Sequence, residues 1–203
     1  MTTFLPAAGG YRNLRAYKLS EIIYDMTVIF AERFVRPGSR TRDQMEQAAR
    51  SGKQNIAEGS EASMTSKETE IKLTNVAKAS LEELLLDYED FLRQHQRQQW
   101  GKTHPRIRKL RAYLMSDDFM NNPTKYAHRL NDEEFCNLCI TLINQATYLL
   151  RKLLESQQQL FLEQGGIKEQ MYRARINYRN NMSQTSRTGL TGLNNSHKSN
   201  VNE

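Results

Sequence analysis

SRTRDQMEQAARSGKQNIAEGSEASMTSKETEIKLTNVAKASLEELLL, residues 39–86, is the stretch that decides the fold class of this chain. Its first half carries an apolar stripe at helical spacing, and most members of the stripe are small. They are Met45, Ala48, Ala49, Gly52, Ile56 and Gly59. Glycine inside a helix costs about 1 kcal/mol relative to alanine. Two glycines on one stripe therefore indicate that a neighbouring backbone comes very close, or that Gly59 ends the helix.

Further helical patterns lie on both sides of this stretch. A first helix is predicted from about residue 13 to Phe34, where Arg36-Pro37-Gly38 breaks the pattern. Thr65 and Glu68 fit a capping box that begins a third helix, which fades near Trp100. The apolar stripe of that helix is predicted to comprise Ile71, Val76, Ala79, Leu84 and Tyr88, broadened by Leu85 and Leu86. A fourth helix is predicted to begin at residues 131–134 and to stop at Gly165-Gly166.

These patterns predict an all-α fold, an antiparallel up-and-down four-helix bundle with a basic helical insert and a C-terminal basic extension. The expected parts are an irregular arm over 1–12, the bundle over 13–164 with its insert at 101–130, a basic suffix helix over 165–180 and a disordered tail over 181–203. The tail is assigned from its content of Asn, Ser, Thr and Gly, with few large apolar residues to bury.

The composition excludes several classes of protein. Only 38% of the 203 residues are hydrophobic and only four are proline, which favours helix over sheet. No stretch approaches the roughly 18 apolar residues of a membrane span, and we expect no secretory signal because the N-terminus lacks a basic region followed by an apolar run. Two cysteines are too few for a disulfide framework. We therefore expect a cytoplasmic protein without a membrane partner.

Positive charge gathers in two parts of the chain. The net charge is +6, and residues 97–130 hold eight Lys or Arg against two Asp or Glu. Arginine forks onto phosphate and tyrosine stacks on unpaired bases, so these parts are candidates for nucleic-acid binding. An ordinary solvated surface is the alternative. The candidate residues are Arg106, Arg108, Lys109 and Arg111 in the insert, Arg173, Arg175 and Arg179 in the suffix, and Arg42, Arg50 and Lys53 before the motif QNIAEG.

No catalytic or metal-binding motif stands out. Cys136 and Cys139 form a C-x-x-C inside a strongly apolar helix, where core packing is the simpler interpretation because a zinc site needs about four ligands. The chain has no Glu-x-x-His, as a di-iron bundle would need. We therefore expect no metal, no cofactor and no enzymatic activity. Catalysis through Asn55 and Glu58 stays an open alternative to a structural or assembly role for that pair.

Three short segments carry a family resemblance. The order YRNL at 11–14, QNIAEG at 54–59 and KASLEEL at 78–84 resembles the bacterial four-helix-bundle family of proteins encoded in rRNA intervening sequences. A related branch comprises the accessory proteins of diversity-generating retroelements, and residues from 165 onward resemble the C-terminal suffix of one subgroup. The resemblance assigns a structural or assembly role to the motif residues Asn55, Glu58, Gly59, Ser80 and Glu82.

The resemblance implies an oligomeric ring, with a homopentamer expected, and in the retroelement branch a basic surface that binds nucleic acid and a reverse transcriptase. Together with the charge distribution it gives our first hypothesis, a non-enzymatic oligomeric bundle that binds RNA or DNA through basic surfaces. The second hypothesis is a protein-interaction scaffold or assembly adaptor that does not bind nucleic acid.

Overall fold

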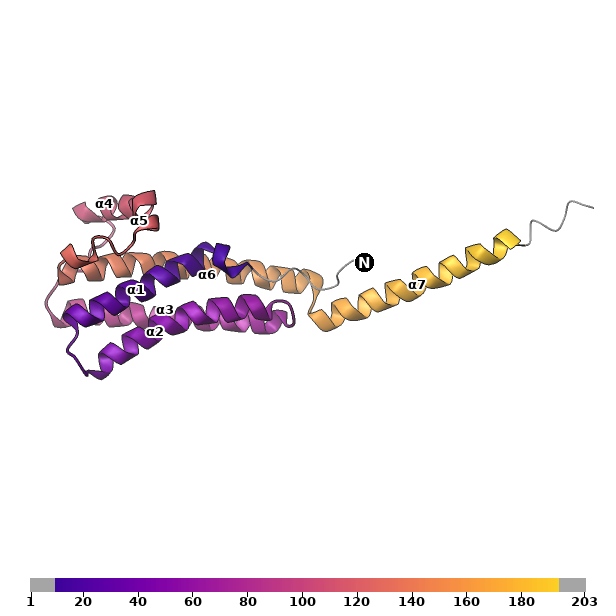
Figure 1. Cartoon of the computed structure of the whole chain (residues 1–203), viewed down its shortest axis with the longest axis horizontal. Coiled ribbons are helices and arrows are strands. Elements are labelled where there is room, and N and C mark those ends of the chain that lie inside the picture. Colours follow the sequence, from indigo (N-terminus) through magenta and orange to yellow (C-terminus); the bar gives the residue numbers. More distant parts are fainter. Residues whose placement is uncertain (1–9, 194–203) are drawn as a thin grey trace, which may run out of the picture. The chain divides into compact units, whose positions relative to one another are not determined.

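The computed structural model describes the backbone of residues 10–193 and the side chains of residues 10–182. The described residues form helices and no strand, so the fold is all-α, as predicted. Figure 1 shows the helices in sequence colours. Their bounds are η1 Tyr11–Asn13, α1 Arg15–Phe34, α2 Arg40–Ala62, α3 Lys67–Gln94, α4 Pro105–Leu114, α5 Asp117–Asn121, η2 Ala127–Arg129, α6 Asp132–Gln164 and α7 Ile167–Leu193.

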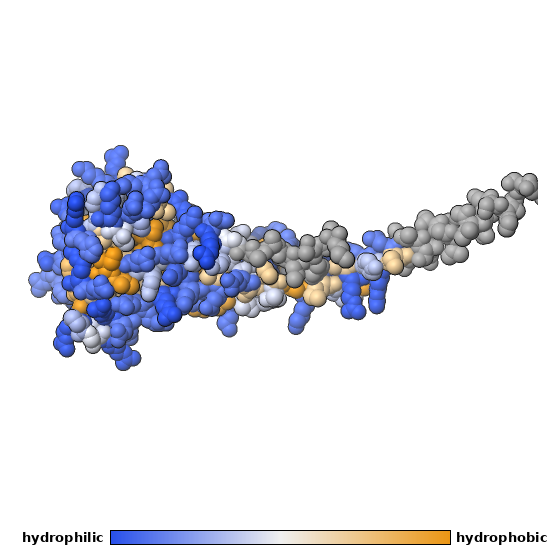
Figure 2. Space-filling view, viewed as in Figure 1, coloured by the Kyte–Doolittle hydropathy of each residue, from blue (hydrophilic) through white to orange (hydrophobic). Residues whose placement is uncertain are grey.

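The chain divides into two units, residues 1–159 and 160–203. In the first unit, hydrophilic residues cover most of the face that Figure 2 shows. No helix within the described residues has both the length and the apolar content that a membrane span requires.

The small-residue stripe of α2 is buried as the sequence predicts. All six members are buried, and α3 packs against them. A Cβ atom placed on Gly52 would lie 2.6 Å from Leu81 Cδ2, and one placed on Gly59 would lie 3.4 Å from the backbone oxygen of Glu70. The close approach of a neighbouring backbone is therefore the correct one of the two interpretations, since α2 continues past Gly59 to Ala62.

The predicted stripe of α3 is wrong in its first half. Val76 and Ala79 are exposed, and so is Leu86. The buried positions are Thr74, Ala77, Leu81, Leu84, Tyr88, Phe91 and Leu92. The small side chains of Thr74 and Ala77 allow α3 to approach the glycines of α2, so close packing overrides hydropathy in setting which face is buried.

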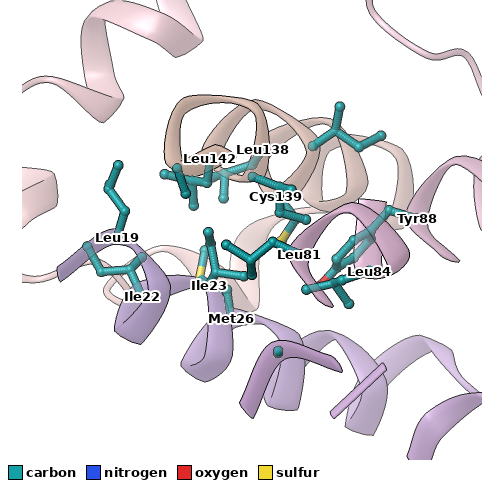
Figure 3. Packing of buried hydrophobic residues seen from close by; sticks show 14 of the residues in the cluster. Leu19, Ile22, Ile23, Met26, Leu81, Leu84, Tyr88, Leu138, Cys139 and Leu142 are labelled. Atoms are coloured by element: carbon teal, nitrogen blue, oxygen red, sulfur yellow. The ribbon is translucent and has the colours of Figure 1, made fainter. Parts of the chain in front are cut away.

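Side chains from α1, α2, α3 and α6 share one hydrophobic core. Figure 3 shows part of it, with residues of α1 pointing toward Leu81 and Leu84 of α3 and toward Cys139 of α6. The Phe30 ring lies 4.9 Å from the Tyr88 ring and 5.5 Å from the Phe135 ring, which joins α1 to α3 and α6. These contacts bury aromatic rings in edge-to-face and tilted pairs that stabilise the core beyond area burial alone.

The starts of α3 and α6 are fixed by side-chain caps. At α3 the cap is Ser66, which accepts a hydrogen bond from the Thr69 amide, and the Ser66 amide donates to the Ala62 carbonyl, so the predicted box of Thr65 and Glu68 is wrong and a single-residue cap replaces it. At α6 Asn131 and Glu134 form the reciprocal box, because each side chain accepts from the other residue's amide, at 2.8 Å to Asn131 Oδ1 and 3.3 Å to Glu134 Oε2.

The end of α6 follows the prediction and the course of α7 does not. Gly165 has φ of +73°, a left-handed conformation that stops α6 after Gln164. The helix α7 then continues to Leu193, through residues 181–193 that the composition assigns to a disordered tail. A helix that has already begun gains one backbone hydrogen bond with each further residue and needs no buried face to continue. Residues 194–203 lie outside the described part.

Candidate nucleic-acid interface

The insert helix α4 is held by two buried apolar residues. Ile107 and Leu114 are buried, while Arg108, Lys109 and Arg111 are exposed. Pro105 occupies the first turn, where its missing N–H costs nothing, and the His104 ring accepts a hydrogen bond from the Arg106 amide. The sequence thus anchors α4 by a narrow apolar side and leaves its cations in solvent.

The connection that leads into α4 is pinned to the start of α6 by Asn137. Asn137 Oδ1 accepts from the Trp100 backbone N–H at 2.6 Å, and its Nδ2 donates to the Gln98 carbonyl at 2.9 Å. Nδ2 also donates to the Glu133 carbonyl within α6. Because the Asn137 side chain is buried, these hydrogen bonds fix the path of the connection with little competition from water.

Glu133 holds the same connection through its carboxylate. Its two oxygens accept from the Gln98 amide and from the Trp100 indole N–H, each at 3.0 Å. The hydrogen bond from Gln98, followed by that from Trp100, lowers the pKa of Glu133 below its ordinary value. The Trp100 ring also stacks on the His104 ring, with 4.8 Å between the ring centroids. The ring is therefore held both by Glu133 of α6 and by His104 of the connection.

A cavity of about 770 Å³ lies between α4, the start of α1 and α6. Its apolar lining includes Leu19, Ile107 and Ile140, and aromatic rings enter it from Trp100 and Tyr148. Figure 2 shows hydrophobic surface between the insert and the helices beneath it. The volume is within the range of small-molecule sites, about 300–1,000 Å³.

The charged residues that line this cavity are all positive. Arg15, Lys102 and Arg111 line it, and its described lining residues include no Asp or Glu. We call it the acid-free cavity. A second cavity beside α4, of about 420 Å³, differs because Glu134 lies in its wall with Arg106 and forms an ion pair with it at 3.0 Å.

The structure separates the four candidate cations of the insert by their partners. Arg106 pairs with Glu134 and also lies over the Trp100 ring. Arg108, Lys109 and Arg111 have no carboxylate partner among the described residues. Three of the four are therefore available to an anion from solution.

The candidates on α2 lie elsewhere. Figure 1 places α2 on the opposite side of the core from α4, so these residues do not extend the surface of the insert. Arg42 pairs with Glu46 at 3.1 Å, and Lys53 Nζ lies 4.4 Å from the centroid of the Tyr24 ring. Arg50 is exposed.

The candidates of the suffix all lie exposed on α7 in the second unit. Arg175 and Arg179 are four residues apart and share one side of the helix, whereas Arg173 lies on another side. Arg173 donates to the Gln164 carbonyl at 3.3 Å. A single continuous basic stripe along α7 is therefore not formed by these three residues.

The motif residues Asn55 and Ser80 come together through Ser51. Asn55 Nδ2 donates to the Ser51 carbonyl and contacts its hydroxyl, which lies 2.9 Å from the Ser80 hydroxyl of α3. Ser51 and Ser80 also line a cavity of about 550 Å³ between α2 and α3. This polar contact joins two of the three segments that carry the family resemblance, QNIAEG and KASLEEL.

The remaining motif residues do not complete a reactive group. Glu58 is exposed and, within the described part of the chain, forms no ion pair with Lys53, which lies over the Tyr24 ring. Gly59 is buried against α3, and Glu82 pairs with Lys78 at 2.6 Å.

Both cysteines lie in the core. Cys136 and Cys139 are buried, and burial raises the pKa of Cys139 to about 12. Burial likewise raises the pKa of Cys136. A thiol with so high a pKa is a poor nucleophile at neutral pH. No cluster of His, Cys, Asp and Glu within the described residues is arranged to hold a metal ion.

Sequence reasoning missed most of the acid-free cavity. Arg15 lies in α1 and Tyr148 in α6, far from the insert in sequence, and no local motif connects them to Arg111. Trp100 and Lys102 lie at the edge of the insert, where the single tryptophan of the chain beside a Gly and a basic run was the one available signal.

No protein-family model, curated protein sequence or solved structure matches this chain. The comparisons therefore assign no family to it. The family resemblance of its three short segments stays an expectation, and the function has to be argued from the geometry of the site.

Proposed function

We propose that this protein is a non-enzymatic, oligomeric helical protein that binds RNA or DNA through the cations of its insert. One observation carries the proposal: Arg108, Lys109 and Arg111 are exposed together on one short helix, without carboxylate partners among the described residues. Several cations elsewhere in the first unit, among them Arg42, Arg93 and Lys78, are paired with neighbouring acids.

The difference matters because a paired cation has little attraction left for phosphate. An unpaired Lys or Arg next to a nucleic-acid strand releases condensed counterions, which supplies most sequence-independent affinity. Arg15 and Lys102, at the acid-free cavity, extend the unpaired charge of the insert toward the bundle. The expected binding is thus dominated by phosphate contacts and not by base sequence.

We interpret α1, α2, α3 and α6 as an antiparallel up-and-down four-helix bundle, with residues 101–130 as its insert and α7 as its C-terminal extension. By resemblance to the retroelement accessory proteins, we also propose assembly into a ring, with a pentamer expected, a cytoplasmic location and a protein partner such as a reverse transcriptase. Light scattering coupled to size exclusion, with and without RNA, tests the assembly.

A salt titration tests the binding itself. A fluorescent single-stranded RNA and a single-stranded DNA of equal length are each titrated with the full chain at salt concentrations from about 50 to about 300 mM. Five unpaired cations predict a slope of about −3.5 in log affinity against log salt for a single strand. No binding at the lowest salt, or a slope near zero, would refute the proposal.

A row of acids on α3 favours the scaffold hypothesis as the second candidate. Glu83 and Asp87 follow one another at helical spacing, and Asp90, which pairs with Arg93, continues the row. Desolvation, with Glu83 and Asp90 nearby, raises the pKa of Asp87 to about 6. Such a row suits a basic protein surface. Pull-down after nuclease treatment separates the two functions, since a protein partner that survives nuclease supports the scaffold.

A further inference from the structure

The geometry points to the acid-free cavity as a receptor for one unstacked base, so that the protein prefers single-stranded RNA or DNA to a duplex. This inference rests on the proposed nucleic-acid binding and adds to it the form of strand that is bound. It follows from three properties of the cavity: an aromatic face, unpaired cations at its wall and amide groups within reach.

The aromatic face for a base comes from Tyr148, and Trp100, whose ring stacks on His104, forms a fixed wall of the same cavity. The Tyr148 side chain lines the cavity although it is 52% exposed, and the Arg151 guanidinium lies 5.2 Å from its ring centroid. A large aromatic residue left in solvent beside an open cavity is a stacking platform for a nucleobase, because every base presents a π-face. Trp100 is held by hydrogen bonds to α6, so this wall is already formed before a ligand arrives.

The cations Arg15, Lys102 and Arg111 lie at the wall of the cavity, within reach of the phosphates next to a bound base. Arg15 Nη2 contacts the Met115 sulfur at 2.8 Å, and a thioether is only a weak acceptor. The Arg15 guanidinium is therefore not neutralised, and the same holds for Lys102 and Arg111 within the described residues. Charge complementarity thus favours an anion with an apolar, flat body, which is the chemistry of a nucleotide.

The cavity also offers amides for the edge of a base. Asn144 and Gln145 of α6 line it, and Asn144 Nδ2 donates to the Ile140 carbonyl at 2.9 Å, which leaves its side-chain oxygen to accept. Bases in a duplex have their edges paired and their faces stacked, so only an unpaired base can enter and use these groups. At about 770 Å³ the cavity is large enough for one nucleotide.

The first experiment uses Trp100, the single tryptophan of the chain, as the probe. The full protein is titrated with a single-stranded oligonucleotide, with a duplex of equal length and with inorganic polyphosphate. We expect the single strand to quench Trp100 emission, and polyphosphate to compete for binding without quenching. A mononucleotide is expected to bind at least a hundredfold more weakly than the oligonucleotide, because it contributes few phosphate contacts.

The second experiment separates stacking from apolar contact. Tyr148→Leu is expected to lower the affinity for the single strand about tenfold and to leave the duplex unchanged, while Tyr148→Phe keeps the original affinity. Leu86→Ala, an exposed apolar residue of α3 outside the cavity, is the control and changes neither.

Equal affinity of Tyr148→Leu and the original protein for the single strand, or equal quenching by the duplex, would overturn the base receptor while leaving phosphate-driven binding in place. A mononucleotide that binds as tightly as the oligonucleotide would show a small-ligand site instead. A protein that binds none of the polyanions would refute the proposed function and the receptor together.

Discussion

The contact between α2 and α3 and the cavity between α4 and α6 are opposite solutions to packing helices in one unit. At the first, Gly52 and Gly59 let α3 come so close that a Cβ atom on Gly52 would overlap Leu81. At the second, Trp100, Arg111 and Tyr148 surround a space of about 770 Å³. Small residues close one region, and long cationic and aromatic residues keep the other open.

The two regions differ in the space that they leave for a ligand. At Gly52 and Gly59, where α2 and α3 are in close contact, the packing tolerates little change in volume. In the open region, hydrogen bonds to α6 fix Trp100, and the described lining residues include cations but no Asp or Glu. A preformed wall and a few polar or charged groups in an otherwise apolar cavity suit the binding of a ligand.

Gly52→Val should destabilise the protein by about 3 kcal/mol, because the added methyl groups overlap the buried Leu81 side chain. The measurement is the free energy of unfolding by urea. Gln54→Val, at an exposed position of the same helix, is the control and should change it by no more than about 0.5 kcal/mol. Equal effects of the two variants would mean that α2 and α3 are not in close contact.

Asn137→Ala should cost about 2 kcal/mol, since it leaves the Trp100 amide and the Gln98 carbonyl without their buried partner. The connection into α4 should then loosen, and Trp100 emission should shift to the red. Asn144→Ala, which removes one hydrogen bond at an exposed position of α6, is the matched control. An unshifted emission spectrum in Asn137→Ala would contradict the claim that the cavity wall is preformed.

Asp87→Asn should stabilise the protein at pH 8 and have almost no effect at pH 4. Desolvation, with Glu83 and Asp90 nearby, raises the folded-state pKa of Asp87 to about 6 from an ordinary 3.8. The neutral form is thus favoured in the fold, and its stabilisation is complete below pH 3.8 and lost as the pH rises through 6. After solvent screening is allowed for, the gain at pH 8 is about 1 kcal/mol.

The measurement is the thermal unfolding of the original protein and of Asp87→Asn at pH 4 and at pH 8. Asp43→Asn, at an exposed position of α2, is the control. A gain for Asp87→Asn at pH 4 equal to that at pH 8 would show that ionisation of Asp87 is not its cause.

The packing of α2 could be predicted from the sequence, and that of α3 only in part. In α2 the glycines and alanines themselves mark the buried side, and all six predicted positions are buried. In α3 the side that faces those glycines is made by Thr74 and Ala77, whereas Val76 and Leu86 point to solvent. Hydropathy selects large apolar residues, so it fails where a close backbone contact requires small ones.

The candidate site could be predicted only where its residues are neighbours in sequence. The basic run of α4 is visible as a run, and the structure keeps its cations exposed. Which of them are neutralised depends on Glu134, and the open cavity depends on Arg15 and Tyr148, which come from other helices. Such pairings are set by the fold and leave no pattern within a single segment.

Two triple variants of equal charge test whether the cations of the insert govern nucleic-acid binding. The first replaces Arg108, Lys109 and Arg111 with Gln, and the second replaces Lys67, Lys78 and Arg93, the carboxylate-paired cations of α3, with Gln. The measurement is the affinity for a fluorescent single-stranded RNA at one low salt concentration. Loss of the insert cations should weaken binding at least tenfold and lessen the salt slope by about 2, and loss of the α3 cations should change neither appreciably. Equal losses in the two variants would show that total charge, and not the insert, governs binding.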